Sequence, residues 1–260
     1  LDWRRSIQEQ VLPGPGRSEL EALFERLTEC MENFITLACT LATVVIVTLA
    51  KPPWVLTSSD SFLPAFRPLM EKFNIKIIYA RACMPEEMRR EYGASAFKSS
   101  EQEADFWMRA KAAAMEREIA EMYKSTGSSW KNIISIGDSD FERVALIATA
   151  ESHMRSESAT ATVSVSGLTS EFTTLEGHVQ RMRAKTVKML EDPSLEELIA
   201  QQTLFKSWLP HLVQRDSGVD IVIENSEDDD RLNEMHHFVT GEHANLSWMH
   251  LAGVDPADEE

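Results

Sequence analysis

The chain has 260 residues, of which 43% are hydrophobic, and a formal net charge of −16 that comes from 42 acidic and 26 basic residues. This length allows one sizeable hydrophobic core. The acidic balance argues against non-specific binding to nucleic acid and against binding to an anionic membrane, because both need a basic surface.

The first part of the chain predicts a helix, a core strand and a stop. Apolar residues recur at the spacing of an amphipathic helix at Leu20, Leu23, Phe24, Leu27, Met31 and Phe34. Residues 34–50 carry no charge, but they are slightly short of the ~20 residues of a membrane span. We interpret them as the buried end of the helix followed by the strand Val44–Val47. Pro52 and Pro53 stop any element there.

Strands and helices then alternate along the chain. Apolar runs and turn residues predict strands at 76–79, 132–136, 160–166, 182–190 and 219–223, and helices at 62–73, 100–124, 140–154 and 195–209. This alternation is typical of a parallel sheet with helices on both faces. We therefore expect an α/β fold with a doubly wound, Rossmann-like parallel sheet.

We expect three regions in the chain. Residues 1–165 form the predicted α/β core, and residues 166–223 form a small C-terminal α+β extension. From residue 224 onward, acidic runs replace sustained apolar periodicity, so residues 224–260 are expected to be a disordered tail that is dispensable for folding. A protein partner could bind through this acidic tail.

Two carboxylates mark the candidate functional site. Gly137 and Asp138 follow the apolar strand predicted at 132–136, and Glu142 comes four residues later, on the first turn of the next helix. Open α/β sheets place their chemistry at the carboxyl ends of strands, and two carboxylates there can hold a hard cation such as Mg²⁺. The alternative interpretation is structural, because Gly and Asp also form turns and helix N-caps.

With Gly-Asp-x-x-x-Glu at a strand end, the alternating pattern resembles the haloacid dehalogenase-like (HAD-like) superfamily, whose members are mostly Mg²⁺-dependent phosphatases and phosphotransferases. Trp3 and residues 47–54 are similar to a poorly characterised eukaryotic subgroup. The family's first motif, Asp-x-Asp-x-Thr/Ser-apolar, is matched at Asp2, Ser6 and Ile7. The resemblance makes Asp2 the nucleophile, and Arg4 stands where the family has its general acid/base.

The resemblance also assigns roles to residues in the middle of the chain. Thr48 ends the apolar strand Val44–Val47 and would hydrogen-bond the transferred phosphoryl group. Lys111, which we expect near the start of a helix, would neutralise charge on Asp2 and on the phosphate. Lys98 is a poorer candidate for this role.

The function implied by the resemblance is hydrolysis of a phosphorylated substrate through an aspartyl-phosphate on Asp2. Asp2 and Asp138 would ligate Mg²⁺, and Glu142 would ligate it directly or through water. The departing alkoxide needs a proton, which Arg4 does not supply because the pKa of arginine is above ~12. Two interpretations stay open: a weak or degenerate phosphatase, and a non-catalytic HAD-like binding or regulatory module.

Histidines and cysteines suggest less chemistry. His236, His237 and His243 could bind zinc, but no cysteine accompanies them, and tail composition is the simpler interpretation. Buried free thiols are expected, and free thiols predict a reducing compartment, the cytoplasm. No Cys-x-x-Cys pair occurs among Cys30, Cys39 and Cys83.

Overall fold

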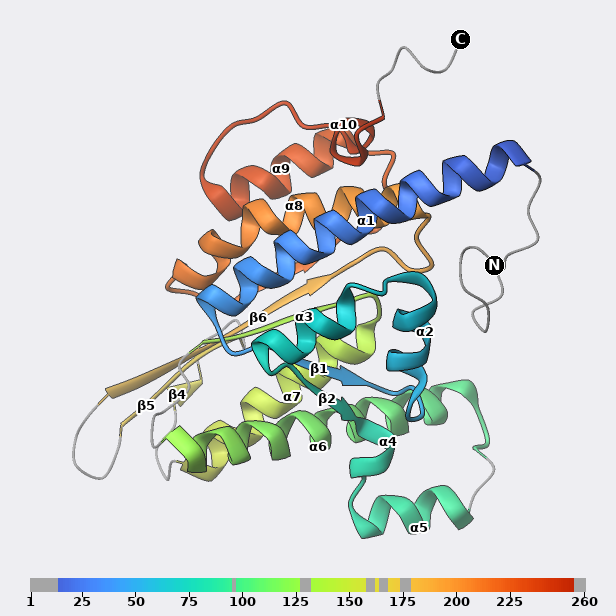
Figure 1. Ribbon diagram of the computed structural model, residues 1–260. Helices are drawn as coiled ribbons and strands as arrows, with labels where there is room; N and C mark the ends of the chain where they lie inside the picture. The colour runs from blue at the N-terminus through green and yellow to red at the C-terminus, as the bar shows by residue number, and fades with distance from the viewer. Residues whose placement is uncertain are drawn as a thin grey trace.

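A computed structural model describes residues 14–94, 97–126, 132–157, 162–163, 168–173 and 179–254, so Asp2 and Arg4 lie outside it. The fold is mixed α/β and mostly helical (Figure 1). Its helices are α1 (Gly14–Leu41), α2 (Trp54–Phe62), α3 (Phe66–Phe73), α4 (Ala80–Cys83), α5 (Glu86–Ala94), α6 (Ser100–Thr126), α7 (Asp140–Glu157), α8 (Leu195–Gln214), α9 (Asp229–Thr240) and α10 (Trp248–Ala252). Its strands are β1 (Val45–Thr48), β2 (Lys76–Tyr79), β3 (Asn132–Gly137), β4 (Thr162–Val163), β5 (Thr169–Thr173), β6 (Val179–Lys188) and β7 (Val219–Val222).

The described strands form two sheets. β1 and β2 pair in parallel, with Val45 opposite Lys76. The second sheet is centred on β6, whose C-terminal half pairs in parallel with β3 on one edge and with β7 on the other. The N-terminal half of β6 pairs with β5 in antiparallel fashion, and β5 pairs with β4. Because β3 and β6 are neighbours, the domain boundary expected near residue 165 runs through one hydrogen-bonded sheet.

Most of the predicted elements are present, with shifted ends. The strand predicted at 76–79 is β2, and β3, β6 and β7 differ by a few residues from their predictions. The helix expected at 62–73 begins only at Phe66, as α3, and the separate helix α2 before Pro64 was not predicted. Pro210 lies inside α8 and does not end it, because the last turn places Leu212 in the core. The polar strand β5 was not predicted.

Helices cover both faces of the parallel part of the second sheet. Side chains alternate between the two faces of β6, as in any strand. Met182 and Ala184 pack against Leu146 and Ala150 of α7. Val187 faces the opposite side and joins a core cluster that is built largely on α8.

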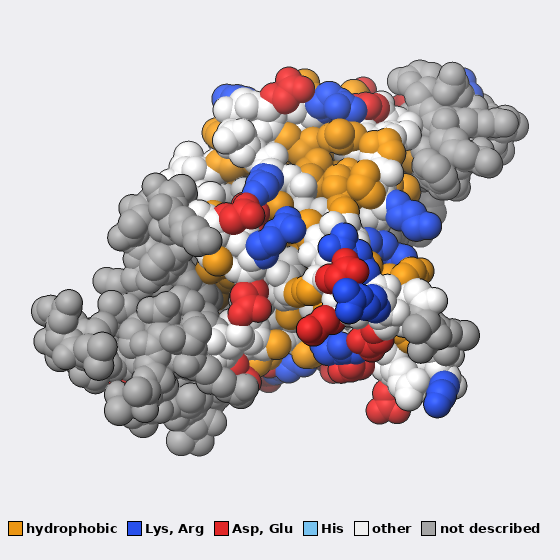
Figure 2. All heavy atoms as spheres, turned by 90° about the horizontal axis from the view of Figure 1, so that it is seen from below, with side chains coloured by type: hydrophobic (Ala, Val, Ile, Leu, Met, Phe, Trp, Pro, Cys, Tyr) orange, Lys and Arg blue, Asp and Glu red, His pale blue; other side chains and the backbone are white. Residues whose placement is uncertain are grey.

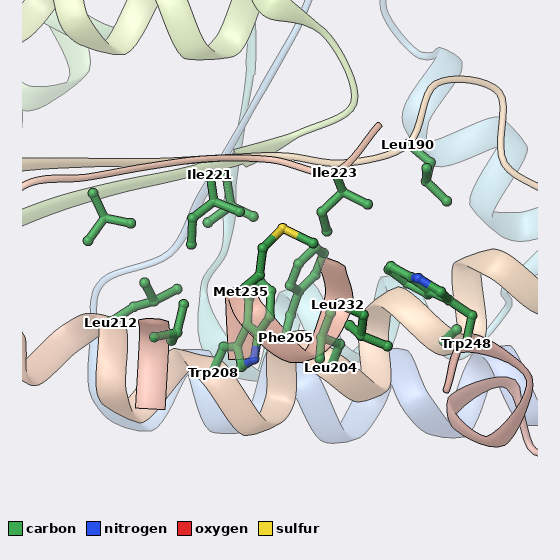
Figure 3. Close-up of a cluster of buried hydrophobic side chains, with 14 of the residues drawn as sticks. Leu190, Leu204, Phe205, Trp208, Leu212, Ile221, Ile223, Leu232, Met235 and Trp248 are labelled. Carbon is green, nitrogen blue, oxygen red and sulfur yellow. The ribbon is translucent and has the colours of Figure 1, made fainter. Parts of the chain in front are cut away.

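The largest core cluster lies between the sheet and α8. Figure 3 shows Ile221 and Ile223, from the end of the sheet, above Phe205 and Trp208 of α8, with Leu232 and Met235 of α9 in the same layer. Trp208 is fully buried, and its indole N–H donates to Nδ1 of His236 at 3.1 Å. This hydrogen bond satisfies a polar group that would be costly to bury alone.

The long N-terminal helix α1 lies alongside α8 (Figure 1). Phe24 and Leu27 of α1 pack against Ile199 of α8. The guanidinium of Arg26 donates to the carbonyl oxygen of Ala252 in α10, so the first and last helices are in direct contact. Among the helices in the described part of the chain, none is long and apolar enough to cross a membrane.

The expectation of a disordered tail from residue 224 is wrong for residues up to 254. Leu232, Met235 and Val239 of α9 and Trp248 of α10 are buried in the core cluster under α8. The acidic residues have local structural roles. Asp228 accepts a hydrogen bond from the backbone N–H of Arg231 (2.8 Å) as the N-cap of α9.

The acidic run therefore marks a helix start rather than a tail. Asp229 also accepts from the backbone N–H of Trp248 (2.9 Å) and joins α9 to α10. Carboxylates are favourable at a helix N-terminus because the first turn exposes unpaired N–H groups. The second acidic run, residues 255–260, lies outside the described residues.

Much of the surface charge around α5 and α6 is locally paired. Arg109 of α6 donates to Glu91 of α5 at 2.8 Å and to Asp105 at 2.9 Å. Arg90 pairs with Glu86 within α5. Figure 2 shows this side of the molecule, where Lys and Arg side chains lie among Asp and Glu side chains beside a hydrophobic area. This face is therefore not uniformly negative, although the chain as a whole has a net negative charge.

Lys185 is an unusual residue on the α8 face of β6, because it is a fully buried cation. Its ammonium donates to the carbonyl oxygens of Leu212 and Arg215, with 2.7 Å to Arg215, at the C-terminal end of α8. Carbonyl groups there have no partner within the helix and attract positive charge. Burial lowers the pKa of Lys185 to about 8, and the nearby charges of Arg183 and Arg215 act in the same direction.

The stability of the chain is expected to rise with pH between about 8 and 10.5. In this window the unfolded chain still binds the proton that folded Lys185 has released, which favours the folded state as pH rises. The part of the rise in the free energy of unfolding that comes from Lys185 should reach up to about 3 kcal/mol. Urea denaturation across this window measures it. The rise should be smaller in Lys185→Met. It should be unchanged in Lys206→Met, which alters an exposed lysine of α8. Equal rises in the wild type and both variants would contradict the lowered pKa of Lys185.

Candidate functional site

The carboxyl ends of β1 and β3 meet around the first half of α6. Leu49, directly after β1, and Phe141, at the start of α7, pack against one hydrophobic cluster. That cluster is centred on Phe106 and Trp107 of α6. The structure thereby brings the regions that follow Thr48 and Asp138 to the same part of the molecule.

Lys111 is the centre of the site. Its ammonium forms an ion pair with Oε1 of Glu142, at the start of α7. Only 5% of the Lys111 side chain and 15% of the Glu142 side chain are exposed. Burial lowers the pKa of Lys111 to about 8, while the negative charge of Asp138 acts in the opposite direction. A buried cation therefore lies beside both carboxylates that the sequence singled out.

Glu142 is held on its other side by Ser139. Its Oε2 accepts hydrogen bonds from the backbone N–H (3.1 Å) and the hydroxyl (2.5 Å) of Ser139. The side chain folds back over Gly137, where an added Cβ would lie 2.9 Å from Cβ of Glu142 and still closer to its Cγ. Gly137 is required here for space, because any larger residue would push Glu142 away from Lys111.

Thr48 and Asp138 have different surroundings. Oγ1 of Thr48 accepts a hydrogen bond from the backbone N–H of Ala50 (3.1 Å), within the turn that follows β1. Asp138 is exposed at the end of β3. An exposed carboxylate at this position is available to a ligand or a cation.

The sequence-predicted site is thus brought together in part. Lys111, Asp138 and Glu142 are neighbours, and Thr48 ends a strand at the same rim. Lys111 lies well inside α6 rather than near its start, because α6 already begins at Ser100. The proposed nucleophile, Asp2, lies outside the described residues.

The expected Mg²⁺ ligands fit a hard cation unequally. The carboxylate of Asp138 offers oxygen atoms of the kind that Mg²⁺ prefers. Both oxygen atoms of Glu142 are engaged, one by Lys111 and one by Ser139. Within the described ranges, which omit Asp2, no group of three His, Cys, Asp or Glu residues is placed to hold a metal ion.

One residue at this rim was missed by the sequence analysis. Arg81 is the second residue of α4, which follows β2 directly. Its Nε–H donates to the carbonyl oxygen of Leu49 (2.6 Å), and its guanidinium lies 3.9 Å from the ring centroid of Trp107. The signal for it in the sequence was its place just after a predicted strand.

The histidines make packing and hydrogen-bond contacts within the fold. His236 is buried and accepts from the indole of Trp208, and desolvation lowers the pKa of its imidazole. The rings of His237 and His243 stack with centroids 4.0 Å apart. Cys30, Cys39 and Cys83 are free thiols, as expected, but they are half-buried rather than buried.

Comparison with known proteins adds no family assignment. No protein-family model, no curated protein and no solved structure matches this chain.

Proposed function

We propose that this chain is a HAD-like domain that binds a phosphorylated ligand at the carboxyl ends of β1 and β3 and hydrolyses it only weakly. The observation that carries the proposal is the buried ammonium of Lys111 beside Asp138 and Glu142. Ionisable groups with a strongly perturbed pKa cluster at functional sites. A phosphoryl group is the ligand whose charge such an ammonium can offset.

In the proposed reaction, the carboxylate of Asp2 attacks phosphorus and the leaving oxygen departs with the bonding electrons. Water then hydrolyses the aspartyl-phosphate. Thr48 would hydrogen-bond the phosphoryl oxygens, and Lys111 would offset their charge. Asp2 and Asp138 would hold Mg²⁺, which when bound neutralises further charge on the transferred group.

The fold supports this proposal through its two open strand edges. The doubly wound sheet that the resemblance implies has a further strand between β1 and β3. Among the described residues, β1 pairs only with β2 and β3 pairs only with β6 along these edges. Although both strands are apolar, no side chain of either is fully buried. A strand between them would pair with both.

The second candidate function is a non-catalytic module with the same fold, in the cytoplasm. It is favoured by Glu142, whose oxygen atoms are occupied by Lys111 and Ser139 instead of being free for a metal. It is also favoured by Arg4, which provides no general acid. Such a module would bind a phosphorylated ligand at Lys111 without turning it over.

Arg4→Asp separates the two functions. If the remaining residues are competent, Mg²⁺-dependent turnover of an aryl phosphate should rise by up to roughly 10²-fold, because a general acid is restored. Asp2→Asn in the same background should abolish the gain. Strong wild-type turnover that survives Asp2→Asn would refute the assigned nucleophile. No gain from Arg4→Asp would favour the non-catalytic module.

A further inference from the structure

The guanidinium of Arg81 is fixed in place at the rim of the site. It is held from one side by the carbonyl oxygen of Leu49, the residue after Thr48, and from another by the ring of Trp107. A guanidinium stacked on an indole and hydrogen-bonded through Nε has lost most of its freedom. The Arg81 side chain is therefore ordered before any ligand binds, and ligand binding would not have to pay the entropy of ordering it.

The terminal nitrogens of Arg81 are unused. In the part of the chain that the structure describes, neither Nη1 nor Nη2 has a hydrogen-bond partner, and neither is a buried unsatisfied atom. Arg109, on the same helix as Trp107, differs because Glu91 and Asp105 take its donors. Arg81 therefore presents a fork of free N–H donors without a carboxylate of its own.

Arg81 contacts the helix that carries Lys111. Trp107 and Lys111 are four residues apart in α6 and so share one face of the helix, about 5–6 Å apart. The guanidinium of Arg81 stacks on the ring of Trp107. Lys111, one turn further along α6, forms the ion pair with Glu142. Two cations thus contact this part of α6 near the end of β1: Lys111, which is buried and paired, and Arg81, which is half-buried with open donors.

We propose that Arg81 is a specificity-determining residue of this site, and that the ligand carries a second anionic group besides the phosphoryl group. Arg81 binds the second group, a carboxylate or another phosphoryl, through its terminal nitrogens, while the first group lies at Thr48 and Lys111. The planar fork of arginine matches both oxyanions in bidentate fashion. This inference rests on the proposed function, since it places the first group at Lys111.

Three probes of equal carbon-chain length test the inference by calorimetric binding to the full chain. Propyl phosphate carries one anionic group, 3-(phosphonooxy)propanoate adds a carboxylate, and 1,3-propanediol bisphosphate adds a second phosphoryl. At least one of the two doubly anionic probes should bind wild type about 10-fold or more tightly than propyl phosphate. The probe with the larger gain identifies the second group.

Variants assign the gain to Arg81. Arg81→Gln keeps a donor for the Leu49 carbonyl but removes the charge, and it should abolish the preference, so that the three probes bind this variant with similar affinity. Arg81→Lys, which keeps the charge without the fork, should retain only part of it. Arg231→Gln removes the same charge from an exposed position of α9 and should change nothing. Thermal unfolding checks that each variant is folded.

The outcomes separate the two proposals. A preference that persists in Arg81→Gln, or no preference in wild type although Lys111→Met weakens every probe, would overturn the role of Arg81 alone. No binding of any probe, or binding that Lys111→Met leaves unchanged, would overturn the phosphoryl site and this inference together.

Discussion

Deleting residues 226–260 is expected to abolish cooperative folding of the chain. The deletion removes Leu232, Met235, Val239 and Trp248 from the main core cluster and exposes the α8 side chains beneath them. Each loss of a large buried side chain costs about 2–5 kcal/mol, and a domain has only about 5–15 kcal/mol in total. Circular dichroism should show no sharp thermal transition.

Deletion of residues 255–260 is the matched control, since it leaves every described contact in place, and its melting temperature should stay close to that of the full chain. Trp248→Ala should be intermediate, with a loss of about 3–5 kcal/mol for a buried aromatic side chain. A chain without residues 226–260 that melts within a few degrees of the full chain would show that α9 and α10 do not support the core.

Glu142→Ala is expected to destabilise the chain by about 3–5 kcal/mol, because it leaves the buried ammonium of Lys111 without its carboxylate. The pair itself need not be stabilising, since desolvation offsets much of the attraction between buried charges. The double variant Lys111→Met with Glu142→Ala should therefore lose much less stability than Glu142→Ala alone. Urea denaturation of both single variants and the double variant gives the coupling energy.

Asp140→Ala provides the surface comparison for this cycle. Asp140 lies on the same first turn of α7, and 59% of its side chain is exposed beside Arg143. Removing an exposed ion pair costs about 0–1 kcal/mol. If Glu142→Ala costs no more than Asp140→Ala, or if the double variant loses the sum of the two single losses, then Lys111 and Glu142 do not form a buried pair in solution.

The sequence predicted elements whose signal is local. β2 and β3 are short apolar runs between turn residues, and Ser194 with Glu197 forms the capping box that starts α8. The acidic run at 224–230 concealed α9, although Leu232, Met235 and Val239 have helical spacing. β5 has no apolar alternation. It is a strand because it pairs with β6, and a local sequence pattern does not predict that pairing.

The same division applies to the candidate site. Asp138 and Glu142 were found because their spacing along the chain places both at one strand end. The ion pair of Lys111 depends on how α6 packs on α7, and the open donors of Arg81 depend on the position of Trp107. These are relations between elements distant in sequence, so residue type and spacing alone could not distinguish Lys111 from an ordinary surface lysine.

The contact between α1 and the end of the chain has a consequence during synthesis. Arg26 and the Ala252 carbonyl that it binds are 226 residues apart. At about 5–20 residues per second, the ribosome needs roughly 10–45 s to make the chain between them. For most of that time Phe24 and Leu27 have no α8 to pack against, because α8 is made only at residues 195–214. A nascent chain therefore displays the apolar face of α1 until α8 emerges, and transiently exposed apolar surface of this kind is what chaperones protect.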